Sequence, residues 1–285
     1  MSLADEATQA GLHRVGARPP LFAYLGEVWR RRQFIYRLAR YRIESSNAQN
    51  RLGMAWVILK PTIDAVVYGT VFGIFLMRGN IPHHYIVFLV VGVFMFDYFS
   101  SCFNSGSKSI TKNAHLVQSL SFPRMALPLA LVVQQLLEFV PMLAIIYGVV
   151  LAYGVLPRFD WLMMVPVVVL FTIFNAGIAM ITARLTVHFQ DLTQILPFVS
   201  RILFYTSGVF YSMELAFSYN QTLLHILEFQ PTHEFLSLGR SVLLHEPGFT
   251  VGPEYWVYAS IWAFVSIVFG TIFFWSAEEL YGRVD

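Results

Sequence analysis

Long apolar runs dominate this chain, and their length leaves few folds open. An α-helix needs about 20 mostly apolar residues to cross a lipid bilayer. Membrane β-barrel strands alternate apolar and polar residues over short segments, whereas the runs here are continuous. With 56% hydrophobic and 13% charged residues, the sequence is typical of an all-α membrane protein. It predicts six transmembrane helices, at residues 56–77, 85–102, 125–153, 161–183, 195–211 and 255–275.

The distribution of lysine and arginine predicts the orientation of these spans. If the amino terminus lies inside the cell, the inner loops hold most of the 19 Lys and Arg residues, and only Arg78, Arg158 and Arg240 lie in outer segments. Because positive residues concentrate on the cytoplasmic side, we expect a multi-pass protein of the cytoplasmic (inner) membrane with both termini in the cytoplasm. Residues 1–20 are polar and lack a signal-peptide core, so we expect a flexible cytoplasmic tail before a single transmembrane domain at 21–285.

Residues 21–43 combine helical periodicity with a high density of arginine. The apolar residues recur at spacings near three and four, which places them on one face of a helix. Such a helix suits the cytoplasmic membrane interface, with its apolar face in lipid and its basic face toward anionic headgroups or phosphate. The alternative is a basic flank that only orients the first span. The two sets of residues are Leu21, Phe22, Leu25, Val28, Trp29, Phe34, Ile35 and Leu38, and Arg30, Arg31, Arg32, Arg37, Arg40 and Arg42.

The outer segment before the last predicted span, residues 212–254, is longer than a connection requires. It contains two moderately apolar pieces, at 222–229 and 233–244, separated by Gln230 and Pro231. Each piece is too short to cross a membrane, so both are predicted to form re-entrant or interfacial helices. Such helices could line or close an exit. A folded outer cap without a gating role is the alternative.

The loop between the second and third predicted spans, residues 104–129, indicates a docking surface. It contains a polar and amphipathic piece and is longer than a plain connection. A short cytoplasmic helix that exposes His115, Leu116 and Gln118 would suit a cytoplasmic protein partner. A solvated connection is the alternative.

Ionisable residues inside the predicted spans are Asp64, Asp97, Glu138 and Arg201. Each is costly at bilayer depth, about 3 kcal/mol at a helix centre, so each is expected to face protein or water. A proton or ion relay is one hypothesis. Asp64 and Arg201 lie near the predicted cytoplasmic helix ends, where long side chains reach the interface, so structural or gating roles are favoured.

Aromatic residues gather on the first and fifth predicted spans. Aromatic rings stack on sugar rings, and a pathway lined by them lets a glycan slide without strong fixed hydrogen bonds. Lipid-facing residues and an interfacial aromatic belt are the commoner use, and this feature alone favours that alternative. The residues are Tyr68, Phe72 and Phe75 on the first span and Phe198, Phe204, Tyr205, Phe210 and Tyr211 on the fifth.

Sequence motifs for catalysis and metal binding are absent. The chain contains no Gly-Lys pair, so it cannot form a phosphate-binding P-loop. The His-Glu pairs at 233–234 and 245–246 lack the second histidine of a zinc-protease helix, and the single Cys102 cannot build a cysteine metal site. Ser207 and Gly208 suggest an intramembrane serine protease, but no histidine lies in another span to act as base. We expect no catalytic residue, no metal and no cofactor in this chain.

Four stretches of the sequence resemble one known family, the membrane (permease) subunits of polysaccharide-exporting ABC transporters of the ABC-2 type. This family exports O-antigen, capsule, teichoic acid and related lipid-linked glycans. The resemblance covers nearly the whole chain, and the order and spacing of the stretches make it specific. The stretches are LGMAWVILKP at 52–61, SFPRMALPL at 121–129, FQDLTQILPF at 189–198 and SGVFYSME at 207–214.

The resemblance implies a homodimer that forms a channel and binds two copies of a separately encoded cytoplasmic P-loop ATPase, which holds ATP and Mg. It assigns coupling to the ATPase to two inner loops, and an outer gate to the short helices before the last span. The interfacial helix would lie where the lipid-linked substrate enters. The coupling residues are Lys112, Asn113, His115, Leu116, Gln118, Gln190 and Asp191, and the gate residues are Pro231, His233 and Arg240.

A polyprenyl-pyrophosphate carrier would find charged hydrogen-bond donors at the predicted entrance. The predicted function is therefore the permease half of an ATP-driven exporter of such a lipid-linked polysaccharide, a cell-wall galactan or an O-antigen. The family's Ser-Pro-Val and Asn-Pro are replaced here by SGV at 207 and QP at 230, which affects the gate geometry. The entrance donors are Arg30, Arg31, Arg32 and Lys60, and the channel residues are Tyr68, Phe72, Phe75, Phe198, Tyr205 and Tyr211.

Two other functions stay open from the sequence. One is an ABC-2 exporter of drugs or small lipids, which would share the fold. The other is a membrane enzyme that acts on polyprenol-linked sugars, although the acidic residues of the predicted outer segment are scattered singly rather than clustered for metal chemistry. No nucleic-acid partner is expected.

Overall fold

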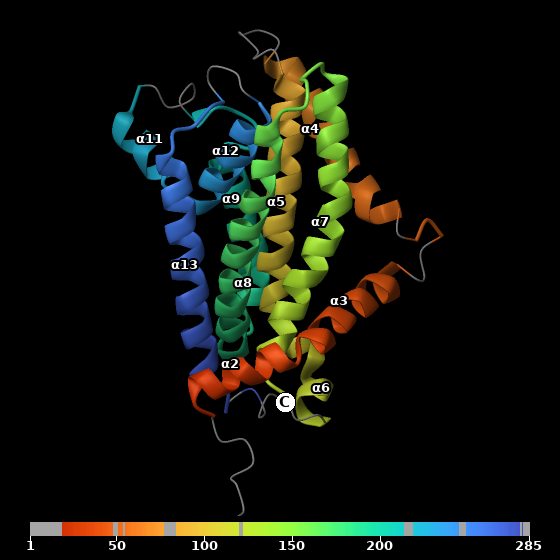
Figure 1. Ribbon diagram of the computed structural model, residues 1–285, viewed down its shortest axis with the longest axis vertical. Helices are drawn as coiled ribbons and strands as arrows, with labels where there is room; N and C mark the ends of the chain where they lie inside the picture. Colours follow the sequence, from red (N-terminus) through yellow and green to blue (C-terminus); the bar gives the residue numbers. More distant parts are fainter. Residues whose placement is uncertain are drawn as a thin grey trace, which may run out of the picture.

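The computed structural model describes residues 19–47, 51–53, 55–76, 84–119, 122–213, 219–244, 249–279 and 281. Regular secondary structure in these ranges is entirely helical, which confirms the predicted all-α class. The helices form an elongated bundle (Figure 1). We call the end with α2 (Leu21–Arg30) and α6 (Ala114–Ser119) the α2 end, and the opposite end, with α11 (Gln221–Glu228) and α12 (Pro231–Leu243), the α12 end. Nearly all of the tail predicted at 1–20 lies outside the described residues.

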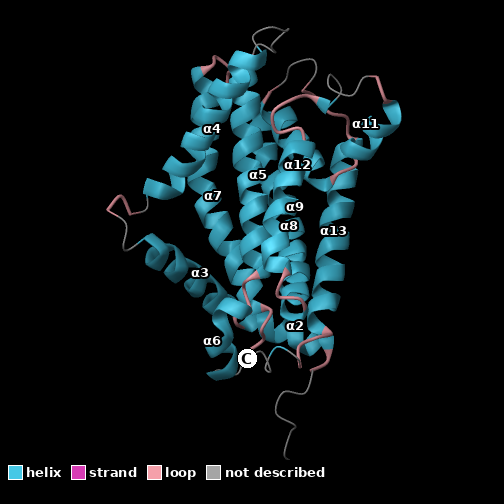
Figure 2. Ribbon diagram, turned by 180° about the vertical axis from the view of Figure 1, so that it is seen from behind, coloured by secondary structure: helices cyan, strands magenta, loops and turns pink. Residues whose placement is uncertain are grey.

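Four of the six predicted spans are confirmed as helices that are long and apolar enough to cross a membrane. They run along the long axis of the bundle (Figures 1 and 2). The 3-10 turn η2 (Phe159–Met163) continues directly into α8, so the two form one candidate span. The four are α5 (Tyr85–Ser107), α7 (Ala126–Ala152), η2 with α8 (Met164–His188), and α13 (Glu254–Trp275).

The first and fifth predicted spans are also helical, as α4 (Ala55–Leu76) and α9 (Leu192–Thr206). However, α9 has only 15 residues, whereas the sequence predicts a helix that continues to residue 211. The chain leaves the helix because Gly208 adopts a φ of +68°, which glycine reaches without steric cost and a right-handed helix excludes. The predicted helix end is therefore wrong, and the total of six membrane crossings stays a prediction.

The segment predicted as one interfacial helix forms two, α2 and α3 (Arg32–Asn47), which meet at Arg31. α2 lies across the α2 end of the bundle, and α3 rises obliquely beside α7 (Figures 1 and 2). One face of the pair is buried and packs on protein, while another set of aromatic residues is exposed. The buried set is Tyr24, Val28, Ile35, Ala39 and Ile43, and the exposed set is Phe22, Trp29, Tyr36 and Tyr41.

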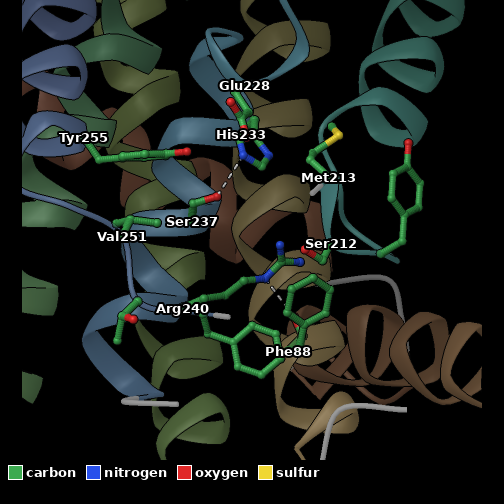
Figure 3. Close-up of a pocket in the computed structure, with 12 residues that line it drawn as sticks. Phe88, Ser212, Met213, Glu228, His233, Ser237, Arg240, Val251 and Tyr255 are labelled. Atoms are coloured by element: carbon green, nitrogen blue, oxygen red, sulfur yellow. Dashed lines mark hydrogen bonds between the residues drawn. The ribbon is translucent and has the colours of Figure 1, made fainter. Parts of the chain in front are cut away.

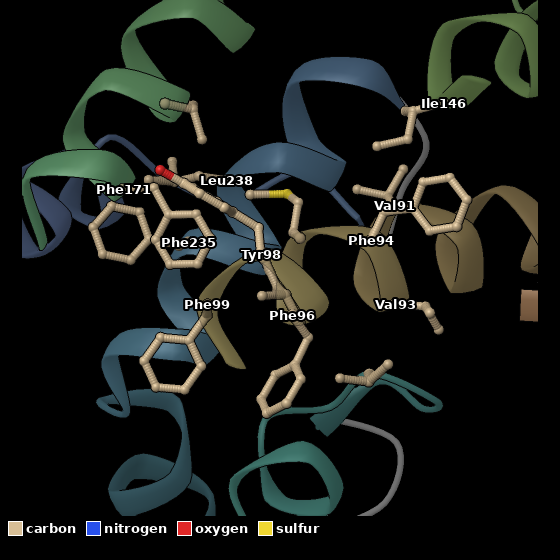
Figure 4. Packing of buried hydrophobic residues seen from close by; sticks show 14 of the residues in the cluster. Val91, Val93, Phe94, Phe96, Tyr98, Phe99, Ile146, Phe171, Phe235 and Leu238 are labelled. Carbon is tan, nitrogen blue, oxygen red and sulfur yellow. The ribbon is translucent and has the colours of Figure 1, made fainter. Parts of the chain in front are cut away.

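α5 occupies the centre of the bundle, in contact with α4, α7, α8, α9 and α12. Most of its side chains are buried, which explains its long apolar run, whereas its polar residues Asp97, Ser100 and Asn104 are only partly buried. The Tyr98 ring stacks on Phe139 of α7 with ring centroids 4.8 Å apart, and its hydroxyl donates to Thr172 of α8 at 2.9 Å. Phe171 of α8 stacks on Phe235 of α12 at 4.7 Å, so α12 belongs to the same core (Figure 4).

α8 and α13 meet through glycines. Gly177 of α8 lies against the backbone of Ser266 on α13, and Gly270 of α13 lies against the backbone of Gly177. Small residues let two helix backbones approach closely, and the resulting van der Waals contact stabilises helix pairs in membranes. The position of α13 against α8 thus depends on the absence of side chains at two positions.

Replacing Gly177 by alanine is expected to lower the melting temperature of the purified protein, because the new methyl group would overlap the Ser266 backbone. Overpacking of this kind costs about 1–3 kcal/mol. Gly148→Ala on α7 is the matched control, since a methyl group there meets no atom within 4 Å and alanine is the better helix former. Thermal unfolding of both variants in detergent checks this, and equal melting temperatures would contradict the close α8–α13 contact.

Glu278, just after α13, ties three distant segments together at the α2 end. Its carboxylate accepts hydrogen bonds from the Tyr24 hydroxyl at 2.7 Å and from the Arg124 backbone N–H at 3.1 Å. The Arg124 guanidinium donates to the Glu278 carbonyl at 2.6 Å, and the Tyr24 hydroxyl accepts from the Met125 N–H at 3.1 Å. Burial raises the pKa of Glu278, while the Tyr24 hydrogen bond lowers it. α2, the start of α7 and the end of α13 are thereby held as one unit.

Candidate functional site

A polar cavity of about 240 Å³ lies between α4, α5 and α9, and we call it the α5 groove. It matters because polar side chains are costly at bilayer depth unless they face protein, water or a ligand. α5 supplies three of the polar residues that line the groove, α9 supplies two and α4 supplies one. The lining consists of the polar residues Asp64, Asp97, Ser100, Asn104, Ser200 and Arg201, and of Val93, Phe96, Pro197, Phe204 and Tyr205.

Hydrogen bonds fix the floor of the α5 groove. The Ser100 and Ser200 hydroxyls lie 2.7 Å apart and link α5 to α9. The Asn104 amide donates to the Ser100 carbonyl at 2.9 Å and to its hydroxyl at 3.1 Å. The Asn104 Oδ1 atom is buried and has no hydrogen-bond partner within the described chain. Asp97 likewise forms no hydrogen bond or ion pair with any described residue, so the groove holds acceptors that the described chain leaves unused.

A second cavity, of about 230 Å³, lies between α4, α5 and α7. Lys60, Gln135 and Glu138 line it together with Asp97. The Gln134 amide donates to the Glu138 carboxylate at 3.1 Å. Asp97 therefore forms part of the wall of both cavities.

The sequence singled out three of these charged residues without predicting that they share a site. Asp64, Asp97 and Arg201 lie on three different helices and meet in the α5 groove. Their position inside apolar spans indicates that each needs a polar partner, but it does not identify that partner. The contribution of Asn104 and Ser200 was missed, because single amides and hydroxyls are ordinary in membrane helices.

The structure brings few of the predicted channel aromatics together. Tyr205 lines the α5 groove, whereas Phe198 on the same helix is 64% exposed and does not line it. Tyr211 belongs to a cavity at the α12 end, and its hydroxyl donates to the Tyr205 carbonyl at 2.7 Å. The remaining three predictions fall on side chains outside the described part of the chain, namely Tyr68, Phe72 and Phe75.

At the α12 end, the buried Arg240 joins α12 to two other segments (Figure 3). Its Nε donates to the Phe88 carbonyl at 3.1 Å, and its Nη1 and Nη2 donate to the Gly208 and Val209 carbonyls at 2.9 Å each. Its guanidinium carbon lies 3.4 Å from the centroid of the Phe88 ring. Three carbonyl dipoles and an aromatic face thus stabilise a charge that would otherwise be costly to bury.

The other two predicted gate residues lie in the first turn of α12. Pro231 occupies the start of the helix, where its missing N–H is not needed. Burial lowers the pKa of His233 to about 4, so its imidazole is neutral. Its Nδ1 lies 3.1 Å from the Ser207 carbonyl and must donate, which leaves Nε2 to accept from the Ser237 hydroxyl at 3.2 Å (Figure 3). All three predicted gate residues therefore lie on α12, which packs closely on the turn after α9.

The helix predicted in the long inner loop is present at the α2 end, as η1 (Thr111–Asn113) followed by α6. Lys112, His115 and Gln118 are exposed there, as a docking surface requires, while Asn113 and Leu116 are half-buried. The structure therefore presents three of the five predicted loop residues to solvent.

The second predicted coupling contact, Gln190 and Asp191, is an exposed turn between α8 and α9. Near the end of α8, the Thr186 hydroxyl donates to the Ser107 carbonyl at the end of α5. Because α5 leads into the loop with α6, the two exposed loops begin at neighbouring helix ends, on one end of the molecule.

The predicted entrance residues are divided between two places. Arg30, Arg31 and Arg32 are exposed where α2 meets α3. Lys60 instead lines the second cavity beside Ser46, near the far end of α3. Since α3 has 16 residues and a helix rises 1.5 Å per residue, these places are separated by roughly 20 Å along α3. The structure does not bring Lys60 together with the three arginines.

Comparison with protein families identifies a match that includes the helices of the α5 groove. A family model described as ABC-2 type transporter matches residues 33–229. This range covers more than half of the chain and includes α4, α5 and α9, which line the α5 groove, as well as both exposed loops at the α2 end.

Curated relatives point in the same direction. The chain is 29% identical over 164 residues to the O-antigen export system permease protein RfbA of Klebsiella pneumoniae, which covers 57% of this chain and 62% of that protein. It is 29% identical over 188 residues to the protein of the same name from Myxococcus xanthus, which covers 66% of this chain and 71% of that protein. The chain thus spans less than two thirds of the length of the Klebsiella relative.

Proposed function

The chain belongs to the ABC-2 type transporter family, and we propose that it is the permease subunit of an ATP-driven exporter that moves a lipid-linked polysaccharide across the membrane. Two relatives from different organisms carry the name O-antigen export system permease, and this is the observation that carries the proposal. The apolar helices and the family make the chain a multi-pass membrane protein. The α5 groove supports the proposal because it offers polar groups at the depth where a glycan must cross.

Two copies of the chain enclose the translocation pathway in this proposal. An exposed apolar stripe on α9, formed by Ile195, Phe198 and Ile202, borders the α5 groove and is suited to contact lipid or a second copy. A second copy placed over α9 would convert an open groove into a closed passage. The α12 cluster around Arg240 would then form the outer gate.

The α2 end faces the cytoplasm of the inner membrane, and both termini lie there. The arginines of α2 and α3 support this orientation. Two copies of a P-loop ATPase dock on the two exposed loops, at Lys112, His115 and Gln118 and at Gln190 and Asp191, and supply the ATP and Mg that this chain has no P-loop to bind. The exposed Arg30, Arg31 and Arg32 receive the pyrophosphate of a polyprenyl carrier of galactan or O-antigen.

The test is to purify the tagged full-length chain from its native cells in mild detergent, and to deplete it from the same cells. We expect a P-loop ATPase to co-purify at one copy per copy of this chain. Depletion is expected to raise the amount of lipid-linked glycan in the cytoplasmic leaflet, measured by lipid extraction and sugar analysis.

Two results would overturn the proposal. One is a monodisperse, folded chain that purifies without any ATPase. The other is a depleted cell with unchanged lipid-linked glycan and changed sensitivity to drugs, which would favour an ABC-2 exporter of small molecules.

A further inference from the structure

We propose that the α5 groove is a binding subsite for one neutral sugar unit of the polymer, with Asp97 as the principal acceptor for its hydroxyl groups. This rests on the proposed function, because the sugar reaches the groove as part of the transported glycan. The pathway would then recognise hydroxyl groups through fixed acceptors, in addition to letting rings slide over aromatic faces.

Unsatisfied acceptors are the first reason. Asp97 lines the groove without a hydrogen bond or ion pair in the described chain. The Asn104 Oδ1 atom is buried and also lacks a partner there. A buried acceptor left unpaired costs free energy, so the Asn104 Oδ1 atom indicates a missing donor. The Asp97 carboxylate is partly buried and faces the groove, where it can accept from a ligand. Sugar hydroxyls are donors of the required kind.

The donor side of the groove is equally suited to a sugar. Ser100 and Ser200 share one hydrogen bond at 2.7 Å, which uses one of their two hydroxyl hydrogens and leaves the other able to donate. Arg201 lines the groove and forms no hydrogen bond or ion pair with a described residue. A polyhydroxyl ring both donates and accepts, so it can satisfy a carboxylate on one side and a guanidinium on the other.

Aromatic residues form the apolar part of the same wall. The Phe96 and Phe204 rings pack with centroids 4.9 Å apart, and Tyr205 follows on the next position of α9. Aromatic side chains combine a large apolar surface with a weakly polar edge, and they suit the C–H face of a sugar ring. The groove thus combines an apolar surface with hydroxyl-binding groups. A sugar ring presents the matching features, an apolar C–H face and several hydroxyl groups.

Charge and size restrict the ligand. Asp64 and Asp97 line the groove with Arg201, and Lys60 acts on Asp97 from the second cavity. These two carboxylates and two cations leave no excess positive charge for a phosphate or an acidic sugar, whereas a neutral sugar requires none. A cavity needs about 10–15 Å³ to hold one water, so a groove of about 240 Å³ has room for a whole ring. The carrier pyrophosphate would stay with the arginines at the α2–α3 junction.

The decisive experiment compares Asp97→Asn with Asp160→Asn, an exposed aspartate in η2. The full complex is trapped with ADP and vanadate and purified from the native cells, and the retained glycan is hydrolysed and quantified per chain. We expect Asp97→Asn to retain about tenfold less sugar than wild type, because an amide replaces a charged acceptor. Asp160→Asn is expected to match wild type, and the retained sugars are expected to be neutral.

Melting temperatures of the same samples separate binding from folding. If Asp97 had a purely structural role, Asp97→Asn would lower the melting temperature. If the carboxylate serves a ligand instead, the melting temperature of Asp97→Asn should be unchanged or raised. Wild-type retention by Asp97→Asn, retention of acidic sugars, or no sugar on the wild-type complex would each overturn the subsite. In all three cases the ATPase would still co-purify, whereas failure of the proposed function would show as its loss.

Discussion

Replacing Arg240 by methionine is expected to be among the most destabilising single changes in this protein. The side chain is 3% exposed and donates to three backbone carbonyls on two segments remote in sequence. Methionine fills part of the volume but leaves the carbonyls of Phe88, Gly208 and Val209 without their donors. Each buried acceptor left without its donor costs about 1–3 kcal/mol. The melting temperature in detergent should fall by many degrees.

Arg158→Met is the matched control, because Arg158 is exposed in the loop after α7. Its melting temperature should stay close to that of wild type. Arg240→Lys should fall between the two, since lysine keeps the charge but cannot reach three carbonyls with a planar fork. If Arg240→Met had the same melting temperature as the control, the contacts of Arg240 in Figure 3 would not hold α12 to α5 and the turn after α9.

The partners of Arg240 are set by tertiary packing and not by local sequence. A position on a short outer helix was predicted, and a gate role was implied by family resemblance. Its partners could not be predicted, since Phe88 and Gly208 become neighbours of Arg240 only when three helices pack. A buried arginine inside 233–244 also looks like a surface charge when only local periodicity is considered.

Long continuous apolar runs were the easiest elements to predict. Length and composition identified α5, α7, α8 and α13 alike, although they differ widely in how much of their surface is buried. α9 was harder, because apolar residues continue past Thr206 while Gly208 turns the chain. The break at Arg31 was not predictable, because Arg30, Arg31 and Arg32 are all compatible with a continuing helix.

The α5 groove was predictable in its parts and not in its assembly. Asp64, Asp97 and Arg201 were recognised as costly, and structural or gating roles were favoured for them. What decides their proposed use is that Asp97 faces the groove without a hydrogen bond or ion pair in the described chain, and a sequence contains no such information. Composition identifies a residue that needs a partner, whereas coordinates show whether the protein provides it.

Replacing Lys112, His115 and Gln118 together by glutamate is expected to remove most of the ATPase that the proposed function requires. These side chains are exposed, while the neighbouring Val117 is 5% exposed and anchors α6 to the bundle. The changes should therefore leave the fold intact and alter only the surface that a partner meets. Interfaces depend on a few central residues. Negative charge placed where the partner is complementary to a lysine disfavours docking, because like charges then face each other. We expect at least a tenfold loss of co-purified ATPase, measured by quantitative mass spectrometry.

The matched control places the same charge on α11 at the α12 end, as Gln221→Glu, Thr222→Glu and His225→Glu. These three residues are also exposed on a short helix, so they test whether added negative charge alone disturbs the complex. The ATPase should co-purify with this variant as with wild type. Equal losses in both variants would indicate a general effect of charge, and retention in both would move the ATPase contact away from η1 and α6. A loss confined to the α2-end variant would place docking on the loop that leads, through Arg124 and Glu278, to α2 and α13. Movement of that loop would then reach the helix that carries the entrance arginines through hydrogen bonds already present in the structure.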